Sequence, residues 1–381
     1  MSAAPPPAAQ PAPRFLALDV FRGASVCVMI VVNSLGPGPH PFPWLVHADW
    51  FGFTLADLVF PSFLFAVGNA MSFTVQRPVS ERVFLARVAR RTALIFLLGY
   101  LMYWYPFVHL TADGHLAGNP IGDTRIMGVL QRIALCFGLA FVAARYLPER
   151  TLAPLCLVVL LGYWGLLLAF GAPGAQLTPF GNAAGLLDRA VLGPPHMYHA
   201  GARGYDPEGL LSTLPAIINV LAGYLAGRWL ARNADKARAA LRLAAAGAML
   251  VLIALAWSPA LPFAKRIWTS SFVVLTVGID LVLLAGLIAY IDVAGRRFGV
   301  RFFEVFGKNP LVIYLFSELF IETLQVFRLP GGLNPYDYVG WTVFQGLAPG
   351  PVGSLACAVA YMLICWGLGY VLDRRRIVIK I

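Results

Sequence analysis

The chain has 381 residues, of which 59% are hydrophobic and only 12% are charged. This balance is too apolar for a soluble globular domain and predicts a protein that lies in a membrane. The formal net charge of +11 comes from short basic clusters between apolar stretches, which excludes an extended basic surface for nucleic acid. The five cysteines lie in apolar runs without a C-x-x-C spacing, so we expect neither a disulfide framework nor a metal site.

The apolar stretches predict an all-α, polytopic membrane protein. Residues 1–14 are rich in Pro and Ala and are expected to form a disordered cytoplasmic tail. Residues 15–376 are expected to form one transmembrane domain, with 377–381 as a second cytoplasmic tail. A span needs about 20 mainly apolar residues, and ten ranges qualify: 16–36, 55–75, 89–108, 126–146, 152–171, 209–230, 240–257, 269–292, 302–323 and 352–372.

The basic residues predict the orientation of these spans, because Lys and Arg are retained on the cytoplasmic side. With the N-terminus inside, most of the basic residues fall on that side, including the clusters at 77–91, 228–242 and 374–380. A minority falls outside, among them Lys265 and Arg266. Ten spans then place both termini in the cytoplasm. The alternative is that a short span such as 240–257 is miscounted, which would invert everything after it.

Three long connections are expected on the outer side, at 37–54, 172–208 and 324–351, whereas the cytoplasmic connections are short. Loops on a rigid helical scaffold often carry function. The alternative for most of their residues is that they only cover the helix ends.

Polar side chains within or beside the spans are informative because a charge in hydrocarbon is costly unless it is paired or lines a cavity. Asp280 is expected near mid-depth. Arg22 and Lys308 lie toward the cytoplasm, and Arg22 could instead be neutralised by Asp19 one turn away. The residues expected near the outer surface are Asn33, Asp57, Gln131, Arg132, Glu318 and Glu322.

Several strings, in order, resemble one family of membrane enzymes. They are RFLALDVFRGASVCVMIVVNSLG, LVHADWFGFTLADLVFPSFLFAVGNAMS, RIMGVLQRIAL, GNAAGLLDRAVLGPPHMY, YDPEGLLSTLPAIINVLAGYLAG, KRIWTSSFV and FGKNPLVIY. Together they are similar to the heparan-α-glucosaminide N-acetyltransferase family, with bacterial members as the better match. The resemblance implies transfer of an acetyl group from cytosolic acetyl-coenzyme A to the amine of a terminal glucosamine across the membrane. The large luminal domain of the lysosomal relatives is absent from this sequence, which favours a small amino sugar or a cell-envelope saccharide as acceptor.

The resemblance also implies the catalytic residues. The family's histidine in H-x-x-W-x-G corresponds to His47, and an imidazole can take a proton at neutral pH. His47 is therefore expected to act as general base, or to carry the acetyl group covalently. Asp57 could orient the imidazole or hold the incoming ammonium group, and Asn33 could polarise the thioester carbonyl. Without the motif, His47 would be interpreted as a surface residue.

Substrate and co-substrate residues follow from position. Asp188, Glu208 and Glu318 are expected near the amino sugar, although Glu208 also fits an ordinary helix start. Arg22, Lys308 and Asn309 are expected at the phosphates of coenzyme A, because Pro310 opens the helix there; both cations could instead contact lipid phosphates. Gln131 and Arg132 are expected nearer the acetyl group or in a structural role.

Two other functions stay open at this point. A secondary transporter also has ten helices, an intramembrane carboxylate and a broken helix, but the two halves of this chain show no repeat. An O-acyltransferase acting on an envelope saccharide is a variant within the enzyme class. The expected location is the bacterial inner membrane, with lipid and the amino-sugar acceptor as partners and no nucleic acid. A homodimer is implied only by the family resemblance.

Overall fold

A computed structural model describes residues 15–111, 113, 115–329 and 331–379. The predicted N-terminal tail therefore lies outside the described residues. Within them the chain is all-α apart from one hairpin, β1 (Val108–Leu110) paired antiparallel with β2 (Leu116–Gly118). The helices are α1 (Leu16–Asn33), α2 (Leu55–Met71), α3 (Glu81–Trp104), α4 (Val129–Tyr146), α5 (Glu149–Phe170), α6 (Ala183–Val191), α7 (Thr213–Arg232), α8 (Lys236–Trp257), α9 (Ser270–Ile288), α10 (Val300–Lys308), α11 (Pro310–Val326), α12 (Pro335–Val339) and α13 (Pro351–Arg374).

The protein is a polytopic membrane protein. Among the described residues, seven helices are long and apolar enough to cross a membrane: α1, α4, α5, α7, α8, α9 with its π-helical extension to Val293, and α13. α2 is a shorter apolar helix, and α3 carries the basic cluster of residues 82–91. Each predicted span overlaps at least one helix, but the number of ten and the cytoplasmic location of the termini stay predictions.

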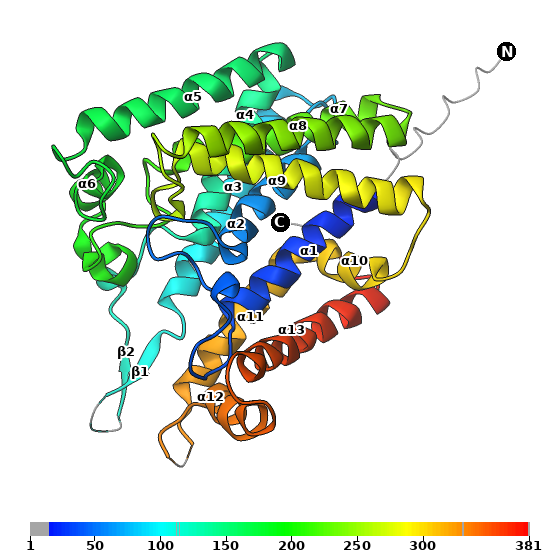
Figure 1. The fold of residues 1–381 in the computed structure, drawn as a ribbon. Coiled ribbons are helices and arrows are strands. Elements are labelled where there is room, and N and C mark those ends of the chain that lie inside the picture. The colour runs from blue at the N-terminus through cyan, green and yellow to red at the C-terminus, as the bar shows by residue number, and fades with distance from the viewer. Residues whose placement is uncertain (1–14, 112, 114, 330, 380–381) are drawn as a thin grey trace.

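The helices pack in antiparallel and crossed pairs around α1. α8 lies along α9, α2 along α7 and α3 along α4, while α1 contacts both α2 and α10. Of the apolar window of α1, 72% is buried, against 22% for α5 and 28% for α8. α1 is therefore central, and the exposed apolar sides of α5 and α8 at the periphery are suited to contact lipid (Figure 1).

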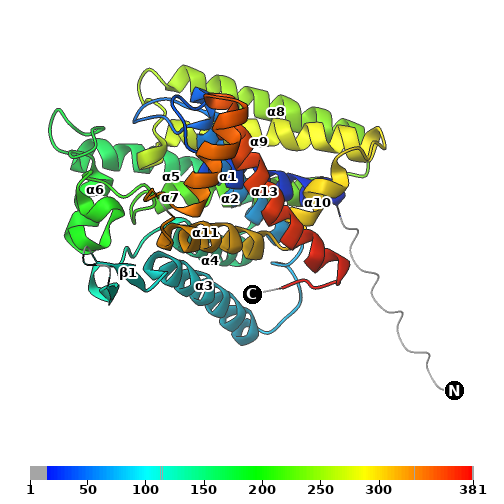
Figure 2. The same cartoon turned by 90° about the horizontal axis from the view of Figure 1, so that it is seen from below.

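The connections divide between the two ends of the bundle. The short turns between α7 and α8 and between α9 and α10 lie at one end, and the segments that contain α6, the hairpin and α12 lie at the other (Figure 1). Figure 2 shows α11 crossing the bundle between α13 and α4. The long loops predicted to lie outside thus share one end of the molecule.

The predicted span 302–323 is divided into α10 and α11 at Asn309, where Pro310 begins the second helix. α10 approaches α1 very closely at Gly23, where an added Cβ would lie 1.9 Å from the Phe303 carbonyl oxygen. Only glycine permits this approach, which brings Arg22 next to the end of α10.

Candidate active site

His47 is held in place by Asp57. His47 lies in the loop that follows the short helix η1 (Pro43–Leu45), and its Nδ1 is 2.9 Å from Asp57 Oδ1. Oδ2 of Asp57 accepts the Ala48 and Thr54 backbone N–H groups at 3.2 and 3.1 Å, and the Thr54 hydroxyl at 3.1 Å. Asp57 is 1% exposed and His47 is 32% exposed. A carboxylate can only accept, so Nδ1 carries the proton and Nε2 keeps its lone pair.

The first turn of α2 explains this geometry. Thr54 and Asp57 form a capping box, in which the side chain at the third helical position accepts the backbone N–H of the capping residue. Asp57 is therefore fixed by the start of the helix before it contacts the imidazole. The ten-residue separation of His47 and Asp57 forms a loop closed by that contact.

Lys265 completes the cluster and was missed by the sequence reasoning, which treated it only as an outer basic residue. It begins η5 (Lys265–Ile267), the turn between α8 and α9. Its Nζ lies 3.1 Å from His47 Nδ1, 3.3 Å from Nε2 and 3.8 Å from Asp57 Oδ1. The family-like string KRIWTSSFV contained this residue and was the signal that could have identified it.

Burial and charge keep the imidazole neutral. Burial lowers the pKa of His47 from its ordinary 6.5, and the charges of Lys265 and Arg266 lower it further, against the opposing effect of Asp57. Burial also lowers the pKa of Lys265 to about 8. Because the imidazole is neutral near neutral pH, its free nitrogen is available to accept a proton or an acyl group there.

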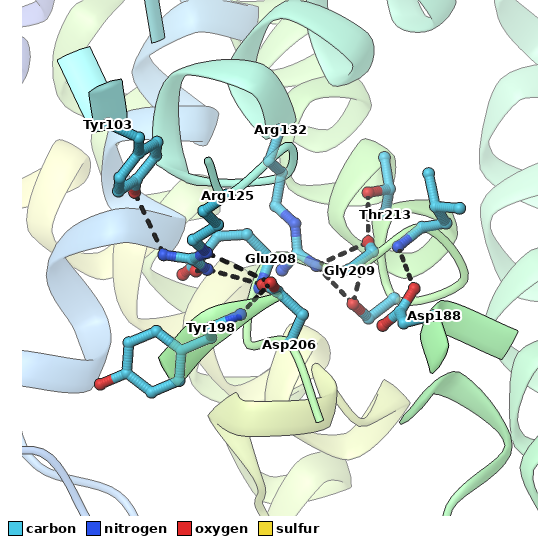
Figure 3. A network of polar contacts seen from close by, with 11 residues as sticks. Tyr103, Arg125, Arg132, Asp188, Tyr198, Asp206, Glu208, Gly209 and Thr213 are labelled. Atoms are coloured by element: carbon cyan, nitrogen blue, oxygen red, sulfur yellow. Dashed lines mark hydrogen bonds and ion pairs between the residues drawn. The ribbon is translucent and has the colours of Figure 1, made fainter. Parts of the chain in front are cut away.

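A second buried network adjoins this cluster (Figure 3). Arg125 forms two hydrogen bonds to Asp206, at 2.6 and 3.2 Å, and one to Glu208 at 2.6 Å. Burial opposes the charge of Arg125, but Tyr103 and the two carboxylates outweigh it and raise its pKa well above the ordinary value. The pKa of Glu208 is lowered in turn: burial favours its neutral form, and Arg125 more than compensates. Glu208 is thus an ionised partner of Arg125, within electrostatic range of Lys265.

Arg132, Gln131 and Asp188 support the same region. The Arg132 guanidinium donates to the Gly209 carbonyl at 3.1 Å and to the Ser212 hydroxyl, and lies over the Trp268 ring. Asp188 accepts the Leu210 N–H at 2.8 Å and packs directly against Gly209, and burial raises its pKa to about 7. Gln131 is fully buried against Gly99 of α3. Arg132 and Asp188 thus hold the segment of residues 209–212, Gln131 packs between α3 and α4, and none of the three lines the cavity described below.

Asn33 and Glu318 form a separate contact. Asn33 Nδ2 donates to Glu318 Oε1 at 3.2 Å, joining the end of α1 to α11. Glu318 and Glu208 both lie within electrostatic range of the Tyr103 hydroxyl. Several of the residues expected on the outer side thus form three groups: His47 with Asp57, Glu208 with Arg125, and Asn33 with Glu318.

A cavity of about 1320 Å³ opens at the opposite end of the bundle. Its walls come from α1, α2 and the loop after it, α3, α4, the end of α10, α11, the end of α13 and the C-terminal segment. The part of the cavity deepest in the bundle is apolar and includes Phe63, Ile133 and Phe137. The part near the mouth of the cavity is strongly cationic. It carries Arg22, Arg77, Arg87, Arg90, Arg91, Lys308 and Arg376, against the two carboxylates Asp19 and Asp373.

The predicted residues Arg22 and Lys308 both line this cavity. Arg22 contacts Asp19 at 2.9 Å and the Gly307 carbonyl, and Lys308 contacts Asp373 at 2.7 Å and Glu304 at 3.2 Å. Asn309 instead binds the C-terminal segment, donating to the Ile377 carbonyl and accepting the Ile379 N–H, both at 2.9 Å. Residues 377–379 of the predicted tail are therefore held against the mouth of the cavity.

Comparison with known proteins identifies relatives of this chain. Residues 14–263 match the family model described as "Heparan-alpha-glucosaminide N-acetyltransferase, catalytic". The human protein of the same name is 29% identical over 367 residues, covering 81% of this chain and 53% of that protein. The mouse protein is 29% identical over 362 residues, covering 80% and 53%. The chain thus spans about half the length of the curated relatives it matches.

Proposed function

The chain belongs to the heparan-alpha-glucosaminide N-acetyltransferase catalytic family, and on that premise we propose that it moves an acetyl group across a membrane. The donor is cytosolic acetyl-coenzyme A, and the acceptor is the amine of a glucosamine-type sugar on the opposite side. We propose further that the membrane is a bacterial inner membrane, with both termini in the cytoplasm.

The observation that carries the proposal is the pairing of two sites at opposite ends of α2. One end of α2 holds Asp57 against His47, and Phe63 on the same helix lines the apolar part of the cationic cavity. The step of six residues from Asp57 to Phe63 corresponds to a rise of about 9 Å along the helix. The apolar part of the cavity thus comes within about 9 Å, along α2, of the site for proton transfer, a gap suited to a flexible thioester arm that extends from phosphates bound at the cationic part.

The cavity has the chemistry that coenzyme A requires. Phosphates are bound by Arg and Lys side chains, and the described wall of the cavity carries many more cations than carboxylates. Its apolar inner part suits an uncharged arm. The described residues therefore fit this co-substrate, which supplies an activated acetyl group when bound.

At the other site, His47 accepts a proton and later returns it. As the bond between the amine nitrogen and the acetyl carbon forms, Nε2 accepts a proton from the amine. As the bond to sulfur breaks, the same nitrogen returns the proton to the leaving thiolate, so the products are an amide and a thiol. In the covalent version Nε2 first attacks the thioester carbon and the thiolate leaves; the amine then displaces the acetyl group from Nε2, and the proton lost by the amine balances the one that the thiolate takes up. Asp57 holds the required tautomer in both versions.

An assay that places the donor and the acceptor on opposite sides of a membrane tests this proposal. The purified protein is reconstituted into sealed vesicles with glucosamine inside and acetyl-coenzyme A outside, and the internal product is identified by mass spectrometry. N-acetylglucosamine inside the vesicles is the expected result. Consumption of acetyl-coenzyme A that yields only O-acetylated sugar would indicate an O-acyltransferase instead. Sugar flux without acetylation would support a transporter.

A further inference from the structure

The position of Lys265 over His47 has a geometric consequence. Nζ is nearly equidistant from the two ring nitrogens, at 3.1 and 3.3 Å. Those nitrogens are joined through Cε1, so an atom at these distances in the ring plane would collide with Cε1. The ammonium group therefore lies over the face of the imidazole, and the in-plane lone pair of Nε2 stays free for a reaction.

We propose that Lys265 is a third catalytic residue of this site, whose ammonium group neutralises the oxyanion that forms beside His47 Nε2 during acyl transfer. The inference rests on the proposed function and deepens it. An acetyl carbon that approaches Nε2 must lie close to the ring plane, so that its oxygen can project toward the face that Lys265 covers. A fixed positive charge at the place where negative charge develops lowers the barrier of acyl transfer.

The surroundings of Lys265 keep it available for this role. Its Nζ is 3.8 Å from Asp57 Oδ1, and its side chain is 13% exposed. Glu208 contributes a further attractive charge, but that carboxylate is already paired with Arg125. The ammonium group is therefore held in place by Asp57 without forming a short salt bridge that would neutralise it.

The same charge controls the protonation of His47. The charged groups around the imidazole are Asp57 from α2 and Lys265 and Arg266 from η5, and those around Lys265 add Glu208 and Arg132. Removing Lys265 leaves the attraction of Asp57 opposed only by Arg266 and burial. The pKa of His47 should then rise, and its neutral form should be lost at a higher pH than in the wild type.

The first measurement is acylation of His47 by diethyl pyrocarbonate as a function of pH, taken as the difference between each protein and its His47→Ala counterpart. This reagent acylates neutral imidazole through a tetrahedral oxyanion and does not depend on any sugar substrate. In Lys265→Met the midpoint should move to higher pH and the plateau rate should fall by roughly 10²–10³-fold. Arg328→Met removes an outer-loop cation that contacts the Gln325 carbonyl and should match the wild type.

The second measurement is acetyl-coenzyme A turnover with glucosamine by the same variants. We expect Lys265→Met to lower kcat by about the same factor with little change in the KM for acetyl-coenzyme A. An unchanged midpoint and plateau in Lys265→Met would overturn the inference. Turnover absent from the wild type, with His47 acylation still dependent on Lys265, would instead refute the proposed function alone.

If Lys265→Met does not fold, the Lys265→Arg variant tests whether the charge at this position promotes acylation of His47. Because the pKa of Lys265 is lowered to about 8, wild-type acylation of His47 should decline as Lys265 loses its proton in alkaline solution. Arginine stays charged there, so Lys265→Arg should lack this decline. A decline identical to that of the wild type would overturn the inference.

Discussion

Replacing Asp57 by Asn tests how the imidazole is oriented. The carbonyl oxygen of the new amide is expected to take the place of Oδ2, where it accepts the Ala48 and Thr54 backbone N–H groups. The side-chain NH₂ group then faces His47 Nδ1 and forces it to accept. The proton moves to Nε2, which loses its lone pair. By analogy with carboxylate-to-amide changes beside catalytic histidines, kcat should fall by roughly 10³–10⁴-fold.

The same substitution has a cost in stability. Asp57 is nearly fully buried and lies 3.8 Å from the Lys265 ammonium group. Removing one partner of a buried ion pair costs about 3–5 kcal/mol, and the lower end applies because Lys265 can lose its proton. Thermal unfolding in detergent, followed by tryptophan fluorescence, should show the loss.

The control is Asp49→Asn, which changes an exposed aspartate two residues after His47. This variant should keep the activity and stability of the wild type. A kcat for Asp57→Asn within about threefold of the wild type, in a preparation where His47→Ala is inactive, would refute the proposed orientation.

Three further predictions concern the cavity, the pH profile and the helix packing. The double variant Arg87→Gln/Arg90→Gln should raise the KM for acetyl-coenzyme A about tenfold or more and leave the KM for the sugar unchanged. The reason is that each charge-assisted contact to a phosphate contributes about 1.5–3 kcal/mol. Equal changes in both KM values would count against the cavity as the donor site. Because the neutral form of His47 is the active one and its pKa is lowered, the acidic decline of kcat/KM should lie below the ordinary histidine pKa of 6.5; an acidic decline above that value would contradict the account. Gly23→Ala should destabilise the protein by about 1–3 kcal/mol in thermal unfolding, since its Cβ would meet the α10 backbone, whereas Gly286→Ala, which meets nothing within 4 Å, should not destabilise it.

The helices could be located from the sequence because hydropathy reports burial and lipid contact directly. Every predicted range overlaps a helix, and Asn309 and Pro310 marked the break between α10 and α11. The number of spans could not be fixed in the same way. α2 and α11 have 17 residues each, and α3 carries basic residues along its first turns, so length and composition alone do not decide whether they cross.

The candidate site shows where sequence reasoning ends. His47 and Asp57 are ten residues apart, and a motif together with a helix start was sufficient to place them near each other. Lys265 is 218 residues from His47, so its contact depends on how α9 packs against α2. The cationic cavity depends similarly on the approach of α1, α3 and the C-terminal segment. Local patterns contain no information about such contacts.

The most direct test of the account is the release of free thiol from acetyl-coenzyme A by detergent-purified protein, with and without glucosamine. The wild type should release thiol in a manner that depends on glucosamine, and a folded His47→Ala variant should not. Equal release by both proteins, or no release with any amino sugar, would contradict the assignment of this chain as a transmembrane acetyltransferase with His47 at its centre.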